Sequence, residues 1–84
     1  MAALDEILAA LTPQRLEQVI LELAAKQPPG ERAGVDVSTI IMALLAGRDL
    51  GQGAARSQNY QRLREAIRAN VALIPGLKYV PSSD

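Results

Sequence analysis

Apolar residues in the first third of the chain recur at helical spacing. The i, i+3, i+4, i+7 pattern predicts an amphipathic helix over 4–11, on Leu4, Ile7, Leu8 and Leu11. It recurs after Thr12, which suits an N-cap, and Pro13, which suits the first helical position, on Leu16, Val19, Ile20 and Leu23. This second helix must end before QPPGERAG (27–34), because proline and the residue preceding it both disfavour helix continuation.

Two more helices are predicted in the middle of the chain. The third runs from about Asp36 or Ser38 to Ala46, and Gly47 suits its C-terminal stop. Because this segment is apolar nearly all round, we expect it to be the central and most buried element. After a glycine-rich turn (47–53), the fourth helix covers about 54–69 and turns Ala55, Tyr60, Leu63, Ala66 and Ile67 toward the core.

The segment NVALIPGLKYVP (70–81) admits two interpretations. In the favoured one, Asn70 closes the fourth helix in a left-handed conformation, and Val71–Ile74 and Lys78–Val80 are extended strands across a type II turn at Pro75-Gly76. In the other, the helix continues to about Leu73. A type II turn splays twisted strands, which weighs against a tight hairpin.

The predicted fold class is therefore mainly α. One small domain over 1–84 forms a compact bundle of four short helices, with a short extended or hairpin C-terminal element within 71–84. A chain of this length buries only about 60–65% of the surface that its unfolded form exposes, so a second copy could contribute to its stability. Self-association is accordingly expected.

The amino-acid composition limits the kinds of catalytic site and metal site that the chain can form. The chain has no Cys and no His, which excludes a disulfide framework, a thiolate or imidazole metal site, and nucleophilic pairs that need either residue. Glu17 and Glu22 do not share a helix face, and Asp5 and Glu6 are adjacent, so neither pair predicts an acid–base dyad. We expect a protein that is not an enzyme and holds no cofactor and no metal.

The charge pattern bears on location and partners. Asp5 and Glu6 lie where a secretory signal would be basic, and the longest apolar run (37–47) is too short to span a membrane, so we expect a cytoplasmic, bacterial-type protein without a membrane partner. Net charge is zero, but residues 1–36 hold six acids and three bases, net −3, and residues 37–84 hold three acids and six bases, net +3. This asymmetry suits either self-association or a nucleic-acid face.

The predicted fourth helix offers a candidate DNA-reading face. Ser57, Gln61, Arg64 and Arg68 share one side at i, i+4, i+7 and i+11, and these residue types read bases and phosphates. Arg48, Arg56 and Arg62 could add phosphate contacts from the flanks. The order of elements looks like a winged-helix or helix-turn-helix arrangement, by fold-level analogy alone, with 70–81 as the wing. The zero net charge and a wing with only Lys78 weigh against DNA.

Two further segments of the sequence could bind a ligand or a partner. LGQGAAR (50–56) has Gly-x-Gly before a helix, but no strand precedes it and Arg56 occupies the third-glycine position, so a flexible turn is favoured over an anion site. The C-terminal apolar segment could complete the core over the third helix, or bind a protein through Val71, Leu73, Leu77, Tyr79 and Val80.

Our first hypothesis is a non-catalytic interaction module, an accessory or adaptor protein. It binds a second copy or another protein through the C-terminal apolar segment and an adjacent helix face. The alternative is a small DNA-binding regulator that reads DNA with the helix at about 54–69.

Overall fold

The computed structural model describes residues 2–26 and 35–77, which form four α-helices and, within those ranges, no strand. They follow one another as α1 (Ala2–Ala10), α2 (Pro13–Ala25), α3 (Val37–Leu44) and α4 (Gly53–Val71). The mainly α prediction is confirmed, and the helix bounds agree with the predicted ranges within two or three residues.

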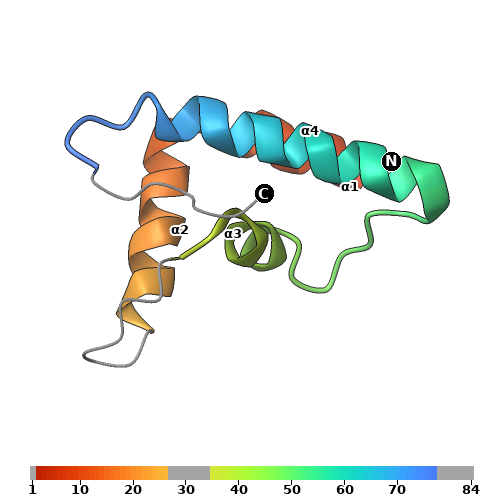
Figure 1. Cartoon of the computed structure of the whole chain (residues 1–84), viewed down its shortest axis with the longest axis horizontal. Coiled ribbons are helices and arrows are strands. Elements are labelled where there is room, and N and C mark those ends of the chain that lie inside the picture. Colours follow the sequence, from red (N-terminus) through yellow and green to blue (C-terminus); the bar gives the residue numbers. More distant parts are fainter. Residues whose placement is uncertain (1, 27–34, 78–84) are drawn as a thin grey trace.

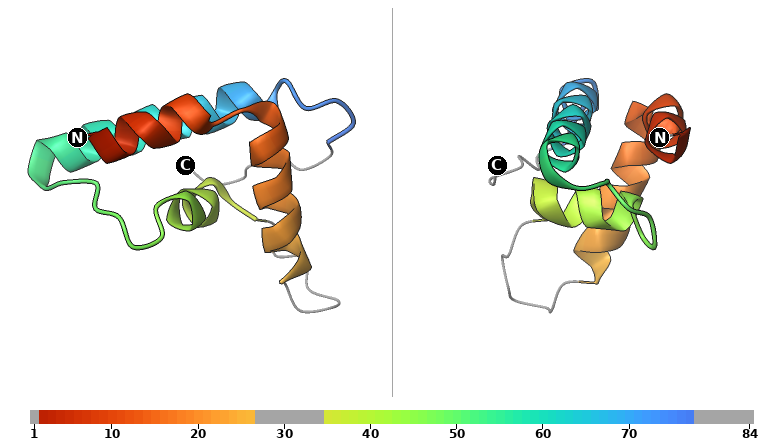
Figure 2. Two further views of the ribbon diagram at one scale, coloured as in Figure 1. Left: turned by 180° about the vertical axis from the view of Figure 1, so that it is seen from behind. Right: turned by 90° about the vertical axis from the view of Figure 1, so that its right-hand side faces the viewer.

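The helices pack in a crossed arrangement around one core. The long helix α4 lies beside α1, and α2 runs across both of them (Figures 1 and 2). Helix α3 packs against α2 and α4 and lies at the edge of the bundle, as the view from the right-hand side shows (Figure 2). One side of α3 therefore faces the core, and no described helix covers its opposite side.

Side-chain caps fix where two of the helices begin. The Thr12 hydroxyl accepts a hydrogen bond of 3.1 Å from the Arg15 backbone N–H, and Pro13 occupies the first helical position of α2, as predicted. Asp36 caps α3: its Oδ1 accepts bonds from the backbone N–H of Thr39 at 2.8 Å and from the Thr39 hydroxyl at 2.9 Å. These bonds stabilise the carboxylate and lower the pKa of Asp36, the backbone bond being the main cause.

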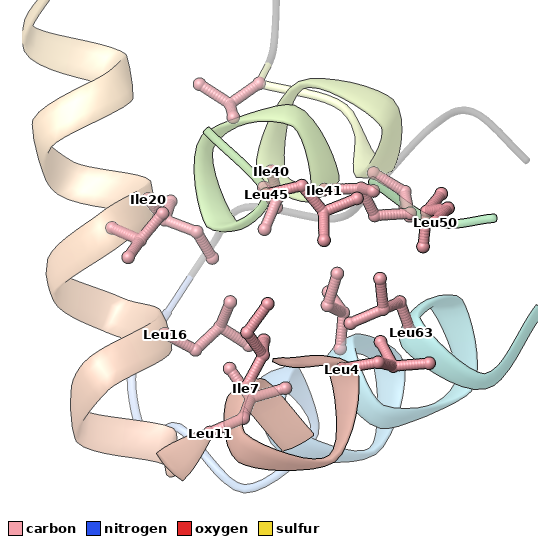
Figure 3. Close-up of a cluster of buried hydrophobic side chains, with 14 of the residues drawn as sticks. Leu4, Ile7, Leu11, Leu16, Ile20, Ile40, Ile41, Leu45, Leu50 and Leu63 are labelled. Carbon is pink, nitrogen blue, oxygen red and sulfur yellow. The ribbon is translucent and has the colours of Figure 1, made fainter. Parts of the chain in front are cut away.

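The core is aliphatic, and among the described residues it contains no buried polar or charged side chain. Figure 3 shows side chains of all four helices and of the α3–α4 turn converging on one cluster. The most completely buried members, each 0% exposed, are Leu16, Ile40, Leu63 and Ile67. Tyr60 is half-buried beside this cluster, and its hydroxyl shares a 2.9 Å hydrogen bond with the Ser38 hydroxyl that ties α3 to α4.

The expectation that α3 is buried all round is wrong for its outer side. Val37, Ile40 and Ile41 are at most 1% exposed, but Met42 is 72% exposed. A helix is enclosed only if neighbours surround it, and this bundle provides neighbours for one side of α3. The helix is therefore half-buried, and its outer side combines exposed Met42 and Ala43 with half-buried Ser38 and Thr39, each one turn earlier on the same side.

The favoured strand over Val71–Ile74 is also wrong. Helix α4 continues through Val71, and Ala72 closes it in a right-handed helical conformation. The chain then turns, with the Leu73 N–H donating to the Asn70 carbonyl (3.0 Å) and the Ile74 N–H to the Val71 carbonyl (3.1 Å). The turn brings Ile74 into the core, where it is 7% exposed.

The expected left-handed closure at Asn70 does not occur. Asn70 is helical, and its side-chain amide donates a 2.8 Å bond to the Ala66 carbonyl one turn earlier. The predicted turn at Pro75-Gly76 is present: Gly76 has a φ of 76°, the value that a type II turn requires at its third residue. The second expected strand, Lys78–Val80, lies outside the described residues.

Candidate functional site

The C-terminal apolar segment mostly covers its own core. Val71 and Leu77 are half-buried against the core cluster, on either side of buried Ile74. Leu73 differs from them, because it is 66% exposed. The other two predicted interface residues, Tyr79 and Val80, lie outside the described residues. Leu73 is therefore the predicted interface residue with the most accessible apolar surface in the described part of this segment.

The predicted DNA-reading strip does share one side of α4. Ser57, Gln61 and Arg68 are exposed and Arg64 is half-buried. A shallow hollow of about 340 Å³ is lined by Arg56, Ser57, Tyr60, Gln61 and Arg64. Within it, Arg64 Nη1 donates a 2.9 Å bond to Gln61 Oε1, so these two proposed readers bind each other. Lys78 lies outside the described residues.

The flanking arginines of that strip point to different neighbours. Arg62 reaches across to α1 and forms an exposed ion pair with Asp5, with 3.2 Å between Nη2 and Oδ1. Arg48 is exposed in the α3–α4 turn and lines two other hollows, beside α3. Of the three predicted flanks, only Arg56 lines the same hollow as the strip.

The α3–α4 turn, expected to be flexible, is held near its middle by burial of one side chain and by two hydrogen bonds. Leu50 is 9% exposed in the core, and its carbonyl accepts a 2.9 Å bond from the Asn59 side chain on α4. The Asp49 carboxylate accepts a 3.1 Å bond from the Gly51 N–H, and Gly51 adopts a φ of 95°, which favours glycine. The glycine at position 51 thus allows the backbone conformation by which the turn connects α3 to α4.

The surface that the sequence pattern did not identify is the outer side of α3. Met42 and Ala43 are exposed there, as is Ala46 in the turn that directly follows α3, and we call these three residues the α3 ridge. Most exposed helix faces carry charged residues, but this one carries none. The absence of charged residues from Val37–Leu44 was a signal in the sequence, but it does not say which side of the helix is left uncovered.

A hollow lies on each side of the α3 ridge. Toward α1 and α2, one of about 470 Å³ is lined by Ile7, Ala10, Leu11, Ala43, Leu44 and Ala46, with Glu6, Arg15 and Arg48 as its charged residues. Toward α4, one of about 310 Å³ is lined in part by Met42, Leu45, Ala46 and Tyr60, with Arg48, Asp49 and Arg56 as its charged residues. The ridge and its two hollows form one surface, which we call the α3 surface.

The charged residues of the α3 surface include both signs. They are Glu6 and Asp49, and Arg15, Arg48 and Arg56. Among residues 2–26 and 35–77, the structure contains one ion pair, between Arg62 and Asp5. The five charged groups of the α3 surface therefore form no ion pair with another described residue. They are available to a molecule that covers the α3 surface.

The described ranges contain neither a metal-binding cluster nor a membrane-spanning helix. Residues 2–26 and 35–77 contain no group of three carboxylates placed to hold a metal ion. None of the helices described is both long enough and apolar enough to cross a membrane. The chain matches no protein-family model, no curated protein and no solved structure, so the geometry of its surface is what supports a proposal of function.

Proposed function

We propose that this chain is a non-catalytic protein-interaction module that binds a protein partner through the α3 surface. The observation that carries the proposal is Met42, which is 72% exposed on a ridge otherwise made of alanine. Methionine is enriched at protein–protein interfaces, in which a core of buried contacts is surrounded by a polar rim.

The energetics favour a partner at this position. Full burial of a methionine side chain is worth about 1.5–3 kcal/mol, and the apolar walls of both hollows would add to it. Ala43 and Ala46 have short side chains, so a partner backbone can approach α3 closely. Methionine adapts its shape to irregular neighbours, which suits a contact residue.

Leu73 supports a secondary role for the C-terminal segment. It is 66% exposed, whereas Val71 and Leu77 are half-buried beside it. A contact there would rest on one described leucine. We therefore place the principal contact on α3 and a secondary contact on the segment that follows α4.

The proposal is tested by site-specific photocrosslinking in cells that produce the chain. A photoreactive residue replaces Met42, and the matched control replaces Leu21, an exposed leucine on α2 that is 59% exposed and lies outside the α3 surface. A third variant carries the photoreactive residue at position 73. We expect a discrete protein adduct from position 42 and none from position 21. Absence of any adduct at position 42, or equal adducts at both positions, contradicts the proposal.

A second candidate function is DNA binding, supported by the shared hollow of Arg56, Ser57, Gln61 and Arg64 on α4. Exposed Arg68 continues the same side of the helix. If α4 reads DNA, Arg56→Ala and Arg68→Ala each weaken binding in a low-salt gel-shift assay without lowering the melting temperature. A chain that retards no DNA at low salt excludes this candidate.

A further inference from the structure

We infer that the α3 surface binds the same surface of a second copy of this chain, which makes a two-fold symmetric dimer. The inference rests on the proposed function and specifies its partner. It is carried by two independent properties of the surface, its shape and its charge.

The shape is self-complementary. A two-fold interface uses the same patch on both subunits, so the patch must contain both the projections and the recesses that receive them. The α3 surface has both, because the Met42 ridge projects between hollows of about 470 and 310 Å³. Two antiparallel α3 helices can therefore place the ridge of each copy in a hollow of the other, as ridges-into-grooves packing requires.

Small residues lie where two such helices would cross. Ala43 and Ala46 are one turn apart on the ridge, and both also line the larger hollow. Short side chains at a crossing allow helix axes to approach toward the lower end of the usual 8–10 Å range. Met42 stands beside them as the long side chain that fills the partner's hollow.

The charges also favour a second copy. A two-fold axis places a patch against itself, so a patch of a single sign would repel its mate, whereas a patch with both signs can pair. Glu6 and Asp49 supply negative charge to the α3 surface, and Arg15, Arg48 and Arg56 supply positive charge. A uniformly acidic or uniformly basic partner would meet like charges there.

Because the chain contains no cysteine, a single introduced thiol can report on the dimer by disulfide formation. In Ala46→Cys, the single thiol lies on the ridge, close to its symmetry mate in the proposed dimer. Under mild oxidation we expect rapid formation of a disulfide-linked dimer. The matched control is Leu21→Cys, whose exposed thiol lies on α2, off the α3 surface, and should link far more slowly. Equal rates for the two variants overturn the inference.

Light scattering on the wild-type chain supplies the second measurement. We expect a mass twice the 9.0 kDa of one chain at high micromolar concentration. Met42→Lys should raise the dimer dissociation constant at least about tenfold, while Leu21→Lys leaves it unchanged. Both positions are exposed, so circular dichroism should show the helical content of the wild type in each variant.

The outcomes separate the inference from the proposed function. A wild-type mass of 9.0 kDa throughout, or a dimer that Met42→Lys does not weaken, overturns the two-fold dimer. If position 42 then still photocrosslinks to a different protein, the interaction module stands and its partner is not a second copy. If position 42 forms no adduct at all, both proposals fail.

Discussion

Replacing Asp36 by alanine should destabilise the chain in a way that depends on pH. Asp36 accepts two bonds from Thr39, at 2.8 Å from the backbone N–H and 2.9 Å from the hydroxyl. Loss of an N-cap costs about 0.5–2 kcal/mol, and the first turn of α3 contains Val37, which is 1% exposed in the core. We expect about 1.5 kcal/mol at pH 7, out of a total of roughly 4–13 kcal/mol for a chain of this size.

That loss should be large enough to measure by thermal unfolding. For a domain of this size, about 1 kcal/mol corresponds to about 4–8 °C in Tm, so Asp36→Ala should melt roughly 6–12 °C below the wild type at pH 7. Circular dichroism of the helical signal gives the transition. Asp49→Ala is the matched control, because it removes a carboxylate whose one described bond, to the Gly51 N–H, lies in an exposed turn.

The pH dependence identifies the carboxylate as the cause. The folded-state pKa of Asp36 lies below the value of about 3.9 of an unperturbed aspartate, chiefly because of the Thr39 backbone bond. The carboxylate therefore stabilises the fold fully above that ordinary value, and the stabilisation is lost as pH falls through the folded-state pKa. The Tm difference between wild type and Asp36→Ala should thus shrink on acidification. A difference that stays constant or grows between pH 7 and pH 2 would refute the capping argument.

Three further substitutions test the packing and the ties between helices. Leu63→Ala removes a side chain that is 0% exposed and should cost about 2–5 kcal/mol in urea unfolding; a cost under 1 kcal/mol would show that Leu63 is not in the core. Tyr60→Phe removes the hydroxyl bonded to Ser38 and should cost about 0.5–1.5 kcal/mol, an effect that should vanish in a Ser38→Ala background. Arg62→Ala breaks an exposed ion pair with Asp5 and should cost less than about 1 kcal/mol, decreasing further in high salt; a larger cost that salt does not change would require another role for Arg62.

The helices could be predicted because their signals are local. Thr12 and Pro13 mark the start of α2 by a cap and a fixed backbone angle, and both act within one turn. The core-facing stripes followed from the 3.6-residue period, which placed Leu16 and Leu63 correctly in the interior. For these elements, tertiary packing agrees with the local preference.

The errors arose where tertiary packing decides. The segment after Asn70 has strand-forming residues, but burial of Ile74 against the core favours a turn in place of the strand. Met42 is exposed because no described helix packs against the outer side of α3. The number of helices that surround α3 cannot be predicted from the residue pattern within it. The α3 surface, which combines α3 with parts of the other three helices, could therefore be recognised only after the helices had been placed.

The side-chain hydrogen bonds and the ion pair that connect different elements of this fold lie outside its core. Within 2–26 and 35–77 no polar side chain is buried, and the bonds that join different elements, Ser38–Tyr60, Asn59–Leu50 and Arg62–Asp5, are half-buried or exposed. Aliphatic residues exchange for one another at little cost when total volume is kept. The interior of this protein should therefore accept many combinations of leucine, isoleucine and valine in a randomised library. Selection for a single arrangement of helices would then act mainly on a few polar residues near the surface.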